Sequence, residues 1–228
     1  MPELSEGRIP KMLTSIIGKS RKFPRRVLCL GAHCDDIEIG CGGTVLRLLR
    51  EEPGCEIFWK VFSSTPPRKR EALKSAGLFL AGAKAKRLVI NRFRDSYFPS
   101  LYGRIKAEFE TLKKEDVPDL ILTHYRHDLH QDHRLVSELT WNTFRSHLIL
   151  EYEIPKYDGD LGAPNFFVGL DRGTSERKAK YICDSFASQR TKQWFTAETF
   201  LALQRLRGIE SNSPDGFAEG FHCRKLVV

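Results

Sequence analysis

Two short segments hold most of the side chains that could do chemistry. The first, Ala32-His33-Cys34-Asp35-Asp36, places a histidine and two adjacent carboxylates within five residues. Adjacent carboxylates repel each other, and burying either one without a cation is unfavourable. A divalent metal resolves this conflict, because His33 and Asp36 can both reach one ion while Asp35 stays free to act as a base on its water. The alternative for this segment alone is an exposed acidic turn with an incidental histidine.

The second segment runs from His127 to His133 and contains three histidines and two aspartates. One of its histidines could complete a His-Asp-His ligand set and leave positions open for water and substrate, as catalytic zinc requires. The alternative is that Asp132 is a helix N-cap and that the histidines face solvent. A shared location of the two segments would favour the metal hypothesis.

Short apolar runs rich in β-branched and aromatic residues predict strands, and amphipathic segments between them predict helices. The predicted strands are 27–30, 56–62, 87–90, 120–123, 149–154 and 166–170, with a possible last strand at 225–228. The predicted helices are 43–50, 69–80, 102–114, 132–146, 175–188 and 197–207, and 208–220 is predicted to be a loop. This alternation indicates βαβ units in a Rossmann-like α/β fold, with a mostly parallel sheet and helices on both faces, as a single domain over residues 1–228. The orientation of the later strands stays open.

The predicted topology brings the two segments together. In an open parallel sheet, ligands bind outside the carboxyl ends of the strands. The first segment follows strand 27–30 and the second follows strand 120–123. We therefore expect both segments at the same edge of the sheet, although more than 90 residues separate them.

Composition narrows the classes of function. The 228 residues have a formal net charge of +8, but their Lys and Arg residues are scattered and no nucleic-acid-binding motif accompanies them. The six cysteines form no C-x-x-C pair, which favours reduced thiols. No apolar run reaches the roughly 20 residues of a membrane span, and no secretory signal is apparent. We expect a cytoplasmic enzyme that binds no nucleic acid and does not insert stably into membranes; a homo-oligomer is compatible with the sequence.

Both segments resemble the paired motifs of the LmbE-like, or PIG-L, N-acetylglucosaminyl deacetylase family. Ala32-His33-Cys34-Asp35-Asp36 is similar to its Ala-His-Pro-Asp-Asp motif, and His130-Gln131-Asp132-His133 to its His-Pro-Asp-His motif. The run Gly40-Cys41-Gly42-Gly43-Thr44 is similar to the glycine-rich start of its first helix. Cys34 and Gln131 replace the two motif prolines, which frees φ at these positions but removes no ligand.

The resemblance implies an LmbE-like fold and a zinc-dependent hydrolase that removes an acetyl group from the nitrogen of an amino sugar. It matches His33, Asp36 and His133 to the zinc ligands, with another divalent cation as an alternative metal. Asp35 matches the general base. His130 matches the histidine that protonates the leaving amine or steadies the oxyanion, and Asp132 the carboxylate that favours its imidazolium form.

Substrate contacts are predicted at Arg68 and Asp95. Arg68 and Glu71 resemble the Arg-x-x-Glu of the family, and Arg68 could hold a phosphate or hydroxyl group; the alternative is a surface arginine. Asp95 follows strand 87–90, at the correct edge of the sheet for binding sugar hydroxyls. Glu219 and His222 could close over the site, with a structural role as the alternative.

Two other functions remain open at this point. One keeps the metal and changes the substrate to a non-sugar amide or a phosphoester. The other is a non-catalytic basic protein that binds glycans or nucleic acid. Asp35 argues against the second, because a binding module has no need for a base beside the metal. The substrate is thus expected to be a small molecule or glycan with an N-acetyl group, whose sugar and carrier the sequence does not name.

Overall fold

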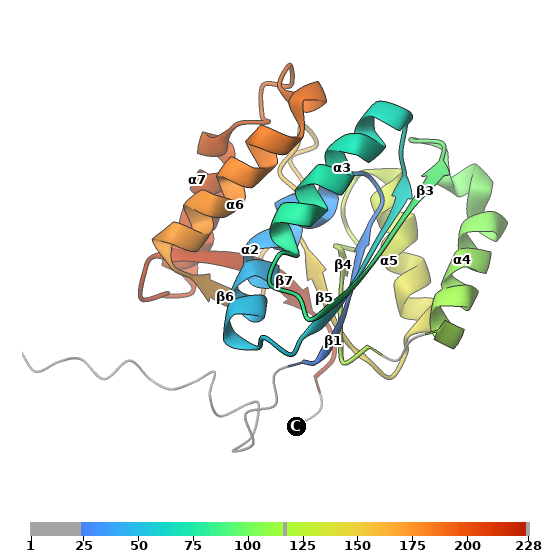
Figure 1. Ribbon diagram of the computed structural model, residues 1–228, viewed down its shortest axis with the longest axis horizontal. Helices are drawn as coiled ribbons and strands as arrows, with labels where there is room; N and C mark the ends of the chain where they lie inside the picture. Colours follow the sequence, from blue (N-terminus) through green and yellow to red (C-terminus); the bar gives the residue numbers. More distant parts are fainter. Residues whose placement is uncertain (1–23, 116–117, 227–228) are drawn as a thin grey trace, which may run out of the picture.

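The fold is described by a computed structural model for residues 24–115 and 118–226. One seven-stranded sheet has the order β3-β2-β1-β4-β5-β7-β6 (Figure 1). The strands are β1 Arg26–Gly31, β2 Glu56–Ser63, β3 Ala85–Phe93, β4 Leu120–His124, β5 Leu148–Tyr152, β6 Phe166–Leu170 and β7 Phe217–Cys223. Strands β1 to β5 are parallel, and β7 runs antiparallel to both β5 and β6. The predicted Rossmann-like, mostly parallel α/β fold is therefore confirmed.

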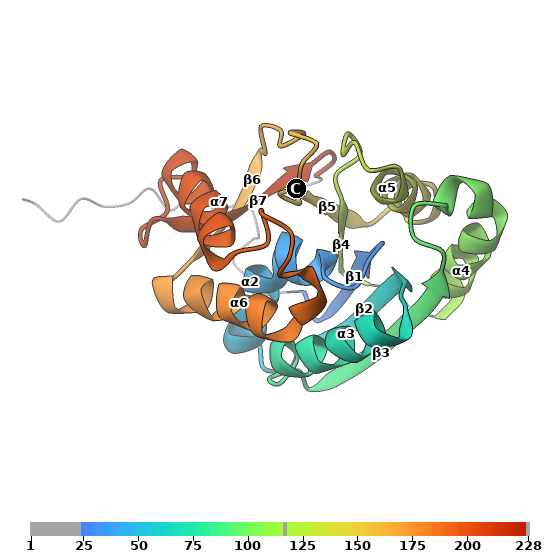
Figure 2. The same ribbon diagram turned by 90° about the horizontal axis from the view of Figure 1, so that it is seen from above.

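Helices cover both faces of the sheet, as Figure 2 shows from above. They are α2 Asp36–Glu51, α3 Pro66–Phe79, α4 Tyr102–Glu115, α5 Gln131–Thr143, α6 Arg172–Ser185 and α7 Ala197–Glu210, with short 3-10 helices η1 Phe98–Leu101 and η2 Ala187–Gln189. Residues of α2, α3, α6 and α7 pack on one face, and residues of α4 and α5 on the other. Because successive strand residues point to opposite faces, β1 supplies Val27 and Cys29 to the first core and Leu28 and Leu30 to the second. Within the described residues, no helix is both long and apolar enough to cross a bilayer.

The strand order creates a crevice between β1 and β4. The chain runs outward from β1 to β2 and β3, and then returns to β4 on the other side of β1. The connections that follow β1 and β4 therefore leave in opposite directions. In sheets of this kind, the ligand site lies at such a switch point, outside the carboxyl ends of the strands.

The last strand differs from the prediction. β7 spans Phe217–Cys223 rather than 225–228; residues 224–226 have no regular structure, and 227–228 lie outside the described residues. The predicted loop at 208–220 covers only 211–216, because α7 continues to Glu210 and β7 begins at Phe217. The polar Glu219 interrupts the apolar pattern that would indicate a strand. It is nevertheless buried, because its carboxylate accepts hydrogen bonds from the backbone N–H groups of Gly43 (2.8 Å) and Thr44 (2.6 Å) and from Lys178 Nζ (2.6 Å).

The first helix begins seven residues before its predicted start. α2 starts at Asp36 and is kinked at Cys41, whose φ of −144° and ψ of 15° are not helical. The carboxylate of Glu219 accepts the backbone N–H groups just after this kink. The glycine-rich run therefore lies inside the helix, where it permits close packing: a Cβ on Gly40 would lie 2.1 Å from the ring of Tyr152.

Candidate active site

A cavity of about 430 Å³ lies above the carboxyl ends of the five parallel strands. Each strand contributes residues that follow it, and the segment after η2 closes the remaining side. The lining residues include His33, Cys34, Asp35, Asp36, Ser63, Arg68, Asp95, His130, His133, Lys156, Tyr157, Asp158, Gln189, Lys192 and Trp194. The expected meeting of the two motif segments is thus observed. Seven of the eight expected site residues line the cavity, and the eighth, Asp132, lies buried behind it.

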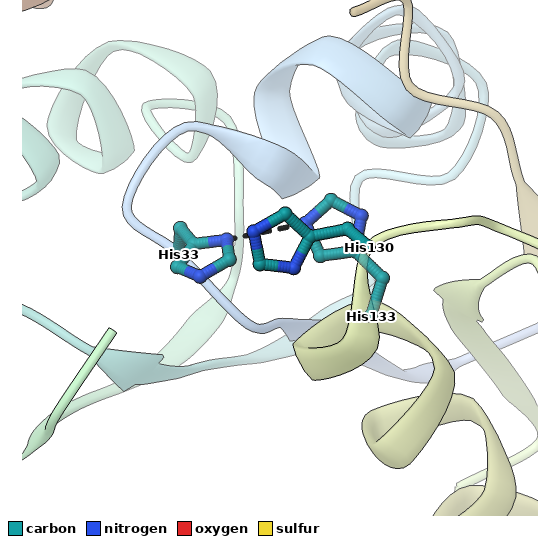
Figure 3. A group of neighbouring side chains, drawn as sticks. All are labelled: His33, His130 and His133. Carbon is teal, nitrogen blue, oxygen red and sulfur yellow. Dashed lines mark hydrogen bonds between the residues drawn. The ribbon is translucent and has the colours of Figure 1, made fainter. Parts of the chain in front are cut away.

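Three donor atoms meet at the floor of this cavity. His33 Nδ1 lies 3.1 Å from His133 Nε2 and 3.4 Å from Asp36 Oδ2, and the last two atoms are 3.5 Å apart. Figure 3 shows the rings of His33 and His133 facing each other, with His130 beside them. Ligands at about 2.0–2.1 Å around a tetrahedral zinc are about 3.3 Å from one another. The three atoms therefore have the spacing that a tetrahedral metal ion requires.

Carboxylates behind the two histidines fix which ring nitrogen faces the centre. His133 Nδ1 lies 2.9 Å from Asp128 Oδ2, and His33 Nε2 lies 3.2 Å from Asp132 Oδ2 and 3.1 Å from Asp95 Oδ1. With the protons on these outer nitrogens, His33 Nδ1 and His133 Nε2 both present lone pairs to the centre. Lone pairs and a carboxylate that converge in this way are stabilised by a cation, so the donor set fits a divalent metal.

The carboxylate of Asp36 is held from two sides. Its Oδ2 accepts a hydrogen bond from the backbone N–H of His33 at 2.6 Å, and His124 Nε2 lies 3.1 Å away. Burial alone would raise the pKa of Asp36, but the neighbouring His133, His124 and His33 lower it well below its usual value. Asp36 is therefore an anion at the floor of the cavity.

Sequence reasoning missed two residues of this centre. His124 ends β4, is fully buried, accepts a hydrogen bond from Ala32 N at 2.9 Å, and stacks on His133 with ring centroids 3.9 Å apart. Together with Asp36 and His133 it forms a second group of potential metal ligands. Asp128 orients His133, as described above. A histidine at the last position of an otherwise apolar strand is the signal that could have indicated His124; no sequence signal pairs Asp128 with His133.

Asp35 is a buried carboxylate that belongs to a different contact network. Its Oδ1 accepts a hydrogen bond from the Arg68 guanidinium at 2.7 Å, and Arg68 also contacts Glu71 and Ser188, each at 3.3 Å. Burial raises the pKa of Asp35, and Arg68 only partly offsets this. The predicted substrate contact at Arg68 thus coexists with a structural one, because this guanidinium positions Asp35.

His130 and Asp132 do not pair as expected. His130 is the N-cap of α5, and its Nδ1 accepts the Asp132 backbone N–H at 3.2 Å. The Asp132 carboxylate instead accepts hydrogen bonds from the backbone of Ser96 (2.7 Å) and Phe98 (3.1 Å), in addition to its contact with His33. Burial and the charge of His33 lower the pKa of His130, and they outweigh the charge of Asp132, which raises it as expected.

The remaining expected residues divide between the cavity and the core. Asp95 is exposed at the rim, and the hydrogen bond from His33 lowers its pKa. Glu219 supports the kink of α2 and His222 stacks on Tyr125, so neither of them lines this cavity. The Cys34 thiol is buried and donates to the carbonyl of Ser63 at 3.4 Å, and burial raises its pKa to about 12.

Solved structures of the same fold come from several organisms. The chain superposes on the conserved protein TT1542 from Thermus thermophilus with a TM-score of 0.68, 20% identity, and coverage of 89% of this chain and 95% of that one. For the N,N'-diacetylchitobiose deacetylase from Pyrococcus horikoshii the TM-score is 0.62 at 20% identity, with 87% and 83% covered. For GalB, the 4-carboxy-2-hydroxymuconate hydratase from Pseudomonas putida, it is 0.66 at 17% identity, with 90% and 98% covered. At these identities the similarity shows the fold alone.

The family match is more specific than these superpositions. Residues 28–144, just over half of the chain, match the family described as PIG-L, GlcNAc-PI de-N-acetylase. The match spans the three donor residues and the elements β1 to α5 that position them. The chain belongs to the PIG-L family.

Proposed function

We propose that this protein is a zinc-dependent N-deacetylase that removes the acetyl group from the nitrogen of an amino sugar. One observation carries the proposal: His33 Nδ1, Asp36 Oδ2 and His133 Nε2 lie 3.1–3.5 Å apart, beside the buried carboxylate of Asp35 in the same cavity. Membership of the PIG-L family supports the class of reaction. His33, Asp36 and His133 would hold the metal.

The residues around this centre have distinct tasks in the proposed reaction. Zinc, when bound, provides a Lewis acid that polarises the amide carbonyl and lowers the pKa of a water molecule toward about 7. Asp35, held by Arg68, accepts the proton of the attacking water, which its burial-raised pKa favours. Because His130 Nδ1 is an acceptor, its proton lies on Nε2, from which His130 donates a hydrogen bond to the amide oxygen as negative charge develops there. The proton that Asp35 takes from the water passes to the leaving nitrogen as the C–N bond breaks, so that the products are acetate and the free amine. Asp95 at the rim is proposed to bind sugar hydroxyls.

Metal analysis combined with acetate release tests this proposal. Purified protein should contain about one equivalent of zinc or another divalent ion. His33→Ala should lose both the metal and the activity, whereas Asp35→Asn should keep the metal and lose about 10²–10⁴-fold in kcat. His127→Ala is the matched control, because this exposed histidine belongs to the same segment but does not line the cavity. Native protein that binds no ion, or an Asp35→Asn variant with full activity, would overturn the proposed mechanism.

A substrate panel separates the proposed reaction from its alternatives. It should include N-acetylated sugars, nucleotide sugars, simple N-acetyl amides and phosphoesters, with free amine, acetate and phosphate as products. Release of acetate from the sugars, and not from simple amides, supports the sugar deacetylase. Turnover of a phosphoester without amide cleavage would instead favour the metal-dependent phosphoesterase.

A further inference from the structure

The positive charge of the chain is concentrated in one segment. Residues 64–94 contain nine of the 37 Lys and Arg residues but only one of the 29 Asp and Glu residues, so the rest of the chain has 28 of each. The segment runs from the residue after β2, through α3, to the residue after β3. The formal net charge of +8 is therefore carried by α3, β3 and their connections.

The strand of this segment, β3, lies at the margin of the sheet (Figure 2). Among the described residues, β2 is on one side of it and no strand is on the other. None of its nine residues is buried, whereas seven of the eight residues of β2 are. In the described part of the chain, the only backbone group of β3 that bonds outside its ladder with β2 is the carbonyl of Asn91, which accepts a hydrogen bond from Ser64 Oγ at 2.6 Å. The outer edge of β3 is therefore free to pair with another strand.

The exposed side chains along this edge are cations, and most of them have no anionic partner. The single acid of the segment, Glu71, is occupied by Arg68 and by the backbone N–H of Ser188 in η2. Arg87 pairs with Glu115 on α4 at 2.6 Å. Within residues 24–115 and 118–226, no carboxylate oxygen lies within 4.0 Å of the charged groups of Lys69, Arg70, Lys84, Lys86, Arg92 and Arg94.

The free edge and the unpaired cations together indicate one kind of partner. A second copy of the chain is disfavoured, because β3 contains only cations, and like charges opposite each other destabilise a strand pair. Nucleic acids and anionic lipids would match the charge, but they have no peptide groups that could extend the ladder. An extended acidic polypeptide matches both features, because its backbone continues the sheet while its carboxylates meet the cations.

We propose that β3 binds an extended acidic segment of another protein, which adds to the outer edge of the sheet. Lys86 and Arg92 contact its carboxylates within the new strand pair, and Lys84 and Arg94 do so at the two ends. None of these four residues lines the cavity, so the surface is separate from the candidate active site. The inference goes beyond the proposed function and does not depend on it.

Synthetic peptides of about ten residues with blocked termini test the charge requirement. Their sequences are repeats of Thr-Glu, Thr-Gln or Thr-Lys, and binding of the full-length protein to each labelled peptide is measured by fluorescence anisotropy. The Thr-Glu peptide should bind about tenfold more tightly than the Thr-Gln peptide, and the Thr-Lys peptide should bind most weakly.

Charge reversal on β3 should reverse this order. In the double variant Lys86→Glu/Arg92→Glu, the Thr-Lys peptide should bind more tightly than the Thr-Glu peptide. The matched control is Arg177→Glu/Lys180→Glu, which reverses two exposed charges on α6 and should keep the original order. The unfolding midpoints of both variants show whether they are folded.

The unsubstituted protein tests strand addition itself. A Pro-Glu repeat has the same charge as the Thr-Glu peptide but lacks half of its N–H groups and fits poorly into a sheet, so it should bind about tenfold more weakly. The Thr-Glu peptide should also slow the amide hydrogen exchange of residues 85–93, which binding through charge alone would not do.

Several outcomes would contradict the inference. Equal binding of the Thr-Glu and Pro-Glu peptides without protection of β3 would mean that the surface recognises charge only. Binding of oligouridylate or of phosphatidylserine vesicles, but of no peptide, would assign the surface to another class of partner. If nothing binds, the cations serve only to prevent β3 from pairing. Peptide binding should be unchanged in the His33→Ala variant, so that loss of the proposed deacetylase function and loss of this surface can be told apart.

Discussion

The floor of the cavity and one of its walls differ in how firmly their side chains are held. The wall consists of the lining residues Lys156, Tyr157, Asp158, Gln189, Lys192 and Trp194. At the floor, His33, Asp36 and His133 are buried or half-buried, and each has a partner behind it that fixes its orientation. At the wall, Tyr157 and Lys192 lie on irregular segments and face solvent. A metal centre tolerates only small errors in ligand geometry, whereas recognition of a carrier can be adjusted on exposed segments over a rigid scaffold. The floor therefore has the fixed geometry that the proposed metal centre needs, and the exposed wall is suited to substrate recognition.

The largest effect should come from disturbing the packing under the floor. In Gly40→Ala, the new Cβ would lie 2.1 Å from the fully buried ring of Tyr152, so the free energy of unfolding should fall by about 3 kcal/mol. Gly77→Ala on the exposed side of α3 is the control: its Cβ meets nothing within 4 Å, and it should gain up to about 1 kcal/mol. Urea unfolding measures both. Equal stabilities of the two variants would mean that the floor is not tightly packed.

A smaller effect is expected from removing an orienting group. Asp128→Ala leaves His133 Nδ1 without its acceptor, so the dissociation constant of the metal should rise about 10–100-fold. Asp158→Ala makes the same chemical change at the wall and should leave metal affinity unchanged. Competition with a chelator of known affinity measures both constants. If both variants lose metal equally, the metal affinity does not depend on the contact between Asp128 and His133.

The pH dependence of the free energy of unfolding tests how much the burial of an acidic side chain in α2 destabilises the protein. Glu38 on α2 is fully buried, neither carboxylate oxygen has a hydrogen-bond partner among the described residues, and burial raises its pKa from 4.5 to about 8. The unfolded chain loses this proton near pH 4.5, while the folded protein keeps it until about pH 8. Folding thus takes up a proton in this window, and stability falls as the pH rises through it.

Glu38→Gln removes this proton uptake. At pH 8 the variant should be more stable than the parent by more than about 1 kcal/mol, whereas at pH 4 the two should agree. Chemical denaturation of the metal-free proteins across this range is the measurement. A constant difference between the two proteins at all pH values would show that Glu38 does not titrate as described.

The smallest effect is expected at the wall. Trp194→Ala should raise the KM for the preferred substrate about fivefold, which corresponds to the loss of one aromatic contact of about 1 kcal/mol. The kcat and the metal content should not change. Because Trp194 also packs against the core and against Phe195, its effect on stability is measured separately by urea unfolding. A fall in kcat at unchanged KM would place Trp194 with the floor instead.

The sequence predicted the parallel part of the fold well, because buried parallel strands are continuous apolar runs. Strand 27–30 corresponds to β1 Arg26–Gly31, and 120–123 corresponds to β4 Leu120–His124. β7 was missed because its Glu219 is satisfied by Gly43, Thr44 and Lys178, at least 41 residues away in sequence. The residues next to Glu219 in the sequence do not indicate such distant partners.

Some contacts of the site residues could be predicted from the sequence, and others could not. The positions of the two motifs, each directly after a predicted strand of a parallel sheet, were enough to predict that His33, Asp36 and His133 meet. The partners of Asp132 could not be predicted, because its hydrogen bonds go to Ser96 and Phe98 on a separate connection. The role of Asp128 depends likewise on the rotation of the His133 ring, which sequence spacing does not determine.

The contact between Glu219 and the kink of α2 also constrains how the protein is made. Asp36 is the first residue of this helix and emerges early from the ribosome, whereas β7 is synthesised more than 180 residues later. Until then, the N–H groups of Gly43 and Thr44 have no carboxylate to bind, and the helix that begins at the cavity floor lacks its final support. Maturation of the centre must therefore follow, rather than accompany, translation of the motifs that define it.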